Sequence, residues 1–136
     1  METTGVTLDT DILIDLLRNA GKAVGLLAEL EERRLILSTT VINAFELYHG
    51  AYRTRRREEN VSATRRLLSR LVVLALSPRA AETAGRVYAE LEEGGEPIGL
   101  RDALIGAISL TRGYPIVTRN VEHLRRIPGL SVMSAT

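Results

Sequence analysis

The chain has 136 residues, of which 45% are hydrophobic and 26% are charged, and its formal net charge at pH 7 is only +1. These values are ordinary for a folded domain, so they exclude an intrinsically disordered chain and a polycation. Because a chain of this length can bury roughly 70% of its unfolded surface, residues 1–136 are expected to form a single domain.

Cysteine is absent from the sequence, which excludes disulfides, zinc sites with thiolate ligands and cysteine nucleophiles. The first ten residues lack the basic start and the apolar stretch of a signal peptide. No window of the sequence approaches the roughly 20 apolar residues that a membrane span requires. A cytoplasmic protein that does not associate with membranes is therefore expected.

The first third of the chain predicts two strands, each leading into a helix. Apolar runs at 6–8 and 35–37 have the length of buried strands, while residues 12–17 and 24–30 carry apolar side chains at helical spacing. The first strand therefore delivers Asp9 directly to the start of a helix.

The next helix is predicted over residues 41–50, with Thr39 or Thr40 as its N-cap. Asn43 and Glu46 lie one helical turn apart and form a polar stripe on this helix. The face predicted to meet the core consists of Val41, Ala44, Phe45 and Tyr48. Glu46 is therefore expected to point away from that core contact.

Seven arginines are concentrated in the stretch that follows, with Glu58 and Glu59 between them. They are Arg53, Arg55, Arg56, Arg57, Arg65, Arg66 and Arg70. Such a cluster fits a surface that tracks the phosphates of a nucleic acid, and it fits a solvated helix face with local ion pairs equally well. The sequence leaves both interpretations open.

The middle of the chain predicts one strand and two helices. A β-branched run at 71–74 indicates the strand. Ser77 and Pro78 suit the N-cap and the first position of a helix, and the glycine pair at 94–95 ends it. The next helix, over residues 100–110, is apolar on nearly every side after its one aspartate, so it must be buried.

Two further strands are predicted, one at 116–118 and one at 130–133 on the edge of the sheet. Strands that alternate with helices indicate an α/β fold, here an α/β/α sandwich with a short, mostly parallel sheet of about four to five strands. A site in such a sheet lies at the carboxyl ends of its strands. Asp9 follows the first strand, and Thr118 ends the fourth.

Three acids stand out, because the topology places Asp9, Glu46 and Asp102 near this edge of the sheet. Each has a simpler explanation when it is considered alone. Asp9 or its neighbour Asp11, and likewise Asp102, are good helix N-caps, and Glu46 can be an ordinary exposed glutamate. Three carboxylates in one crevice, however, would repel each other and raise one another's pKa unless a cation lay among them. Oxygen ligands without cysteine or paired histidine select Mg²⁺ or Mn²⁺ over zinc.

Two other enzyme classes share parts of this pattern. The string DTD after an apolar strand resembles the opening motif of haloacid dehalogenase-type phosphatases, but that motif calls for a later lysine, and Lys22 is the only lysine in the sequence. A zinc hydrolase needs paired histidines, whereas His49 and His123 stand alone, outside any HExxH pattern. Both histidines are interpreted as surface or packing residues.

Four segments of the chain, in their order and spacing, resemble a known family. They are LDTDILIDLL, VINAFELYHG, LRDALIGAISL and IVTRNVEHLRRIPGLSV. Together they are similar to the four blocks of a PIN-domain ribonuclease, specifically a VapC-type toxin of a type II toxin–antitoxin system. The resemblance runs almost from one end of the chain to the other, and it implies a PIN-like fold.

The resemblance also implies which residues form the site. In the family, an aspartate after the first strand, a mid-helix glutamate and a later aspartate bind the catalytic metal ion. These positions correspond to Asp9, Glu46 and Asp102. The supporting positions are Thr10, Asn43, Thr118 and Asn120.

One position departs from the family pattern. PIN domains often carry a fourth acid just after the fourth strand, where this chain has Asn120, with Glu122 two residues later. The departure argues against a tightly held second metal ion. The residues expected to hold the RNA backbone are Arg119, beside the site, and Arg53, Arg56 and Arg57 of the arginine cluster.

The activity implied by the resemblance is Mg²⁺- or Mn²⁺-dependent hydrolysis of RNA by a metal-activated water, which leaves 5′-phosphate and 3′-hydroxyl ends. The family also implies a homodimer and a VapB-like antitoxin that blocks the crevice. The alternative function is a catalytically weak PIN domain that binds RNA or assembles a complex. A small-molecule phosphatase is a third and less favoured function.

Overall fold

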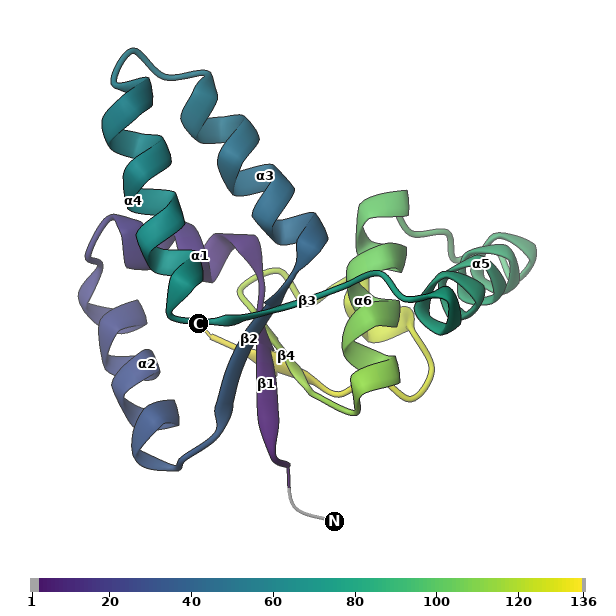
Figure 1. Ribbon diagram of the computed structural model, residues 1–136. Helices are drawn as coiled ribbons and strands as arrows, with labels where there is room; N and C mark the ends of the chain where they lie inside the picture. The colour runs from purple at the N-terminus through teal and green to yellow at the C-terminus, as the bar shows by residue number, and fades with distance from the viewer. Residues whose placement is uncertain (1–2, 136) are drawn as a thin grey trace.

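Five parallel strands form the central sheet of the computed structural model, which describes residues 3–135 (Figure 1). Residues 1, 2 and 136 of the expected single domain lie outside the described part. The strands are β1 (Gly5–Leu8), β2 (Ile36–Thr40), β3 (Val72–Leu74), β4 (Ile116–Thr118) and β5 (Val132–Ser134). Their order is β3-β2-β1-β4-β5, and every neighbouring pair is parallel. The predicted α/β fold is thereby confirmed.

Helices cover both faces of the sheet. They are α1 (Thr10–Leu17), α2 (Gly21–Glu32), α3 (Val41–Tyr52), α4 (Arg57–Ser69), α5 (Pro78–Glu93), α6 (Leu100–Arg112) and a short 3-10 helix, η1 (Leu124–Arg126). Figure 1 shows α1, α2 and α4 on one side of the strands and α5 and α6 on the other. Helix α3 rises from the end of β2 and packs against α4. Helices on both faces are what a parallel sheet requires.

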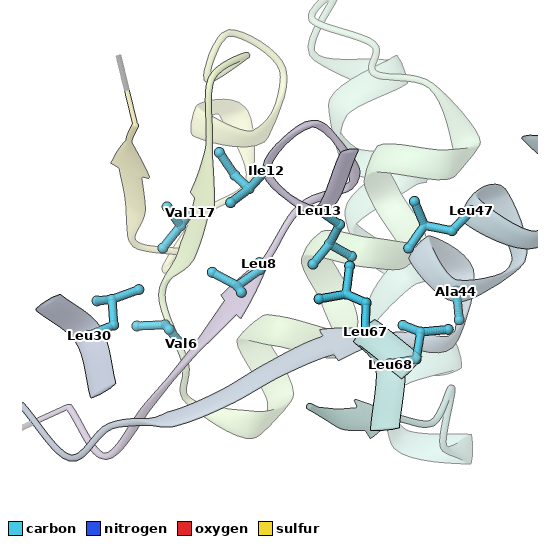
Figure 2. Packing of buried hydrophobic residues seen from close by; sticks show 10 residues of the cluster. All are labelled: Val6, Leu8, Ile12, Leu13, Leu30, Ala44, Leu47, Leu67, Leu68 and Val117. Atoms are coloured by element: carbon cyan, nitrogen blue, oxygen red, sulfur yellow. The ribbon is translucent and has the colours of Figure 1, made fainter. Parts of the chain in front are cut away.

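The strand β1 shows how the two faces are built. Val6 and Leu8 point to the same face and pack with Leu13 of α1 in the hydrophobic cluster of Figure 2. Thr7 points to the other face, where its hydroxyl lies 2.8 Å from that of Ser109 on α6. This alternation is the period of two that a strand imposes on its side chains.

The second core lies on the α6 side of the sheet. It consists of Val87, Ile98, Ala103, Ile105, Ile116, Leu124 and Ile127. Helix α6 is buried around most of its circumference, which confirms the prediction from its apolar sequence. Gly106 allows this packing, because a Cβ atom at that position would collide with the Ile127 side chain.

Three predicted helix ends are confirmed. Thr40 is the N-cap of α3, and its hydroxyl accepts hydrogen bonds from the backbone N–H groups of Ile42 and Asn43. Ser77 caps α5, with Pro78 at the first helical position. Gly94 is the C-cap of the same helix. The two N-caps were predictable because each side chain bonds backbone N–H groups two or three residues away.

The predicted core face of α3 is confirmed for Ala44, which is buried, and for Tyr48, which packs against the hydrophobic cluster of Figure 2, but it is wrong for Val41 and Phe45. Phe45 is 66% exposed and Val41 is 41% exposed. The buried residues of this helix are Asn43, Ala44, Leu47 and Ala51. Ala44, Leu47 and Ala51 follow one helical stripe, and Phe45 lies about 100° around the helix from Ala44, on the solvent side. The Phe45 ring instead stacks on His49, with the ring centroids 5.9 Å apart.

Element boundaries differ from the prediction by a few residues. The last strand covers Val132–Ser134 instead of 130–133, but it lies on the sheet edge beside β4 as predicted. The third strand is one residue shorter than the apolar run at 71–74. Among the helices of residues 3–135, none is long and apolar enough to cross a membrane.

Candidate active site

The three predicted site acids lie together at the carboxyl ends of β1 and β4. Asp9 follows β1 as the N-cap of α1, Glu46 lies in the second turn of α3, and Asp102 lies in the first turn of α6. Their side chains are 5%, 28% and 17% exposed, respectively. Each carboxylate contacts the guanidinium group of Arg101. Three separate segments of the chain thus bring acids to one cation.

Asp9 is the most firmly held of the three acids. Its Oδ1 atom accepts hydrogen bonds from the backbone N–H of Thr10 at 2.8 Å and from the side-chain amide of Asn43 at 3.0 Å. Its Oδ2 atom accepts one from the Thr118 hydroxyl at 2.8 Å. Asp9 therefore caps α1 and also belongs to the acid cluster, so the two interpretations of this residue are compatible.

A chain of side chains links Asp9 to Glu46. The Asn43 amide donates to Asp9 and, at 2.8 Å, to the Thr10 hydroxyl. The Thr10 hydroxyl in turn donates to Glu46 Oε1 at 2.6 Å. The Asn43 carbonyl oxygen accepts from the backbone N–H of Thr40 at 3.2 Å. Because Asn43 is fully buried and bonded at both ends of its amide, it sets the position of α3 relative to Asp9.

Arg101 lies at the centre of the cluster. Its Nη2 atom is 2.9 Å from Asp9 Oδ1, and its Nε atom is 2.6 Å from Glu46 Oε2. Its Nη1 atom is 2.7 Å from Asp102 Oδ1. Burial alone lowers the pKa of Arg101, but the hydrogen bond to Glu46 and the attraction of Asp9 and Glu46 outweigh burial and raise the pKa above its usual value. The side chain is therefore a permanent cation.

Arg101 was not among the residues predicted for the site. A signal was available, because a charge in the first turn of a helix that must be buried is costly unless an opposite charge lies near it. Arg101 and Asp102 are adjacent in that turn, and the sequence offered no way to tell which groups would meet the arginine.

Asp102 was interpreted either as the N-cap of a helix or as a site acid. The first interpretation is wrong, because Asp102 does not cap α6. Gly99 occupies the cap position and the helix begins at Leu100, so Asp102 lies inside the first turn. One of its oxygens contacts Arg101, and the other lies 3.3 Å from Nδ1 of His123. The His123 side chain is 45% exposed, as a surface residue would be, but its contact with Asp102 was not foreseen.

Asp11 fastens the loop that follows β4. Its Oδ2 atom accepts from the backbone N–H of Arg119 at 2.8 Å, and its Oδ1 atom accepts from the N–H of Ile12 at 2.8 Å. The Thr118 hydroxyl lies 3.2 Å from Asp11 Oδ2, but its one hydrogen is better placed toward Asp9. Asn120 is exposed, and its backbone N–H donates to the Thr118 hydroxyl.

The arginines expected to hold RNA lie in two places. Arg119 follows Thr118, which bonds Asp9, but its side chain turns to α1, where its Nε atom is 3.4 Å from Asp15 Oδ2. The other three are exposed at the turn between α3 and α4, far from the sheet in Figure 1. They are Arg53, Arg56 and Arg57. Arg53, at the start of that turn, is seven positions after Glu46, which corresponds to about 10 Å along α3.

Local pairing at this turn is present but weak. Arg56 lies 3.7 Å from Glu59, and both side chains are more than 70% exposed. The Nε atom of Arg57 donates to the carbonyl oxygen of Tyr52 at 2.9 Å. Exposed pairs of this kind contribute little to stability. The turn therefore keeps a positive surface, and both sequence interpretations of the arginine cluster retain support.

The acid cluster has the chemistry of a site for a hard divalent ion, because its donors are carboxylate oxygens of Asp9, Glu46 and Asp102. Arg101 lies among these oxygens, and within residues 3–135 no three acid or histidine side chains are arranged to hold a metal ion directly. Carboxylate oxygens are ligands that Mg²⁺ and Mn²⁺ prefer, but a metal ion would reach these three acids only if the guanidinium left them.

Comparisons with known proteins agree with this geometry. The PIN domain family matches residues 6–130. The chain is 32% identical over 125 residues to the tRNA(fMet)-specific endonuclease VapC of Salmonella typhimurium, and the alignment covers 92% of this chain and 93% of that protein.

Two solved structures are similar over nearly the whole chain. One is VapBC2 from Rickettsia felis bound to a DNA fragment from their promoter, with a TM-score of 0.88, 26% identity and coverage of 95% of this chain and 97% of that chain. The other is DNA-bound VapBC from Salmonella typhimurium, with a TM-score of 0.87, 29% identity and coverage of 98% and 100%. A family match that spans most of the sequence and is accompanied by the same fold shows that the chain belongs to the PIN domain family, among its VapC-type members.

Proposed function

We propose that the chain is a Mg²⁺- or Mn²⁺-dependent endoribonuclease and the toxin of a VapBC-type toxin–antitoxin module. The observation that carries this proposal is the convergence of Asp9, Glu46 and Asp102 from three segments at one edge of the sheet. The similar Salmonella typhimurium protein, named as an endonuclease specific for tRNA(fMet), supports a nuclease that acts on RNA.

In this proposal the three carboxylates hold the metal ion, which when bound polarises the scissile phosphate and lowers the pKa of the attacking water. The protein supplies the fixed positions. Asp9 is held through both carboxylate oxygens, and the Thr10 hydroxyl orients Glu46 by its hydrogen bond to Oε1. Such preorganised groups lose little freedom when the substrate binds. Arg119, on the loop after β4, is proposed to attract the RNA backbone, for which its side chain would leave Asp15.

The proposed partners are a VapB-like antitoxin and a second copy of the chain. The antitoxin is supported by the two similar structures, which are VapBC complexes. A groove of about 340 Å³ between α1, α3 and α4 also opens beside Glu46. Its apolar lining includes Ile14, Leu17, Leu47 and Ala51. A segment bound there would lie against Glu46, one of the three site acids.

The test is an RNA cleavage assay on the purified protein in Mg²⁺, in Mn²⁺ and in EDTA. Glu46→Gln removes one anionic ligand at nearly constant volume, so cleavage should fall by roughly a hundredfold or more. Glu90→Gln is the matched control, because Glu90 pairs with exposed Arg86 on α5, and it should cleave like the wild type. Equal cleavage in EDTA and Mg²⁺, or wild-type cleavage by Glu46→Gln, would contradict the proposal.

The second candidate is a catalytically weak PIN domain that binds RNA or assembles a complex. Two observations favour it: the Arg101 guanidinium lies among the acids, and an exposed asparagine, Asn120, stands where many PIN domains have a fourth acid. Binding of RNA without cleavage at any concentration of Mg²⁺ or Mn²⁺ would support this function over the first.

A further inference from the structure

We propose that Arg101 is the built-in counter-cation of the acid cluster, and that a divalent metal ion must displace its guanidinium group before it can bind. The inference rests on the proposed function, because it takes Asp9, Glu46 and Asp102 as the metal ligands. It assigns Arg101 a positioning role: the side chain holds the three carboxylates together while no metal ion is bound.

The guanidinium group of Arg101 bonds all three carboxylates of the cluster. Each of its three nitrogen atoms bonds a different carboxylate, at 2.6 Å to Glu46, 2.7 Å to Asp102 and 2.9 Å to Asp9. These distances are those of charge-assisted hydrogen bonds, which are stronger than neutral ones. The planar guanidinium group therefore occupies the position between the carboxylate oxygens where a metal ion would bind.

The size and charge of a metal ion make it compete with Arg101 for the same carboxylate oxygens. A Mg²⁺ ion contacts its oxygen ligands directly at about 2.0–2.1 Å, so it cannot share them with a guanidinium group that lies between them. Two cations in one small cluster also repel each other. Metal binding therefore has to break the three contacts of Arg101.

The position of Arg101 allows its side chain to leave the acid cluster. Its side chain is 37% exposed, whereas that of Asp9 is 5% exposed, so the guanidinium lies on the solvent side of the deepest acid. The residue is in the first turn of α6, and its flexible stem can turn toward solvent without moving the helix. Displacement is thus a side-chain rotation and needs no change of fold.

The expected size of the effect follows from population arithmetic. An apparent dissociation constant equals the intrinsic one divided by the fraction of molecules that are competent to bind. With three charge-assisted bonds to break, we expect the displaced arrangement to be populated at about one tenth or less. Removing the guanidinium should therefore tighten metal binding by at least about tenfold.

The experiment measures binding of Mn²⁺ to the full chain by calorimetry, without RNA. Arg101→Met removes the guanidinium and keeps an extended stem, and we expect its Kd for Mn²⁺ to be at least about tenfold lower than that of the wild type. Arg86→Met is the control, because it removes one positive charge from a surface pair on α5, and its Kd should match the wild type. In EDTA, Arg101→Met should melt below the wild type, because its acids lack a counter-cation, and it should gain more from Mn²⁺.

If Arg101→Met does not fold, Arg101→Lys serves as the second test variant. A lysine is a point charge that cannot bond three carboxylates as a planar fork does, so its Kd should lie between those of the wild type and Arg101→Met. Equal Mn²⁺ affinity in the wild type and the Arg101 variants would overturn the inference and leave the proposed function standing. Absence of Mn²⁺ binding in all of them, at millimolar concentrations, would overturn both.

Discussion

Replacing Asn43 with alanine is expected to destabilise the protein by about 4 kcal/mol. The Asn43 side chain is fully buried and donates to Asp9 and Thr10, and it accepts from the N–H of Thr40. A hydrogen bond to a charged group contributes roughly 1.5–3 kcal/mol and a neutral one roughly 0.5–1.5 kcal/mol. Asp9 keeps three other donors, among them Thr118, so no charge is left without a partner and the loss does not exceed that of the hydrogen bonds themselves.

The assay is urea unfolding, with a thermal melt as a second measure. A loss of this size should lower the Tm of a chain of 136 residues by roughly 10–15 °C. Asn60→Ala is the matched control, because the Asn60 amide donates to Thr54 at the surface, and it should change stability by less than about 0.5 kcal/mol. A change below about 1 kcal/mol in Asn43→Ala would refute the view that this side chain holds α3 against Asp9.

Gly106→Ala should destabilise the protein by about 1–3 kcal/mol in urea unfolding, because its new Cβ would meet the Ile127 side chain; Gly85→Ala, where the space is open, should be neutral or slightly stabilising. Asp11→Asn should reduce RNA cleavage less than Asp9→Asn, because Asp11 acts through the loop after β4, and equal losses with unchanged melting would argue for a chemical role. An RNA with a 2′-deoxy group at the scissile position should still be cut and leave a 3′-hydroxyl end, so a 2′,3′-cyclic phosphate seen by mass spectrometry would exclude hydrolysis by a metal-activated water.

Much of the fold was predictable because its signals are local. The caps at Thr40 and Ser77 act on backbone groups two or three residues away, and the predicted segments 6–8, 35–37, 71–74 and 116–118 each overlap a strand. The buried face of α3 was not predictable in the same way. Choosing between Leu47 and Phe45 as the core residue depends on which side of α3 packs against neighbouring helices, and only the folded arrangement determines that.

The site acids were predictable from the sequence, whereas the residues that contact them were not. Topology alone brings Asp9 and Asp102 to one edge of a parallel sheet, because strand ends and helix starts meet there. The partners of these acids depend on side-chain directions across distant segments. Arg101 lies 55 residues from Glu46, and His123 lies 21 residues from Asp102, so no spacing rule connects them.

One face of α6 connects the packing of the second core to the acid cluster. Asp102 and Gly106 are four residues apart, so they lie on the same face of this helix. His123 contacts Asp102 at the start of that face, and Ile127 fills the space that Gly106 leaves one turn later. Residues 123–127 therefore dock along α6 as a unit, around the helix η1. A Cβ atom at position 106 would meet the end of the Ile127 side chain, and unless that side chain turned aside, the segment that carries His123 would be pressed away from Asp102.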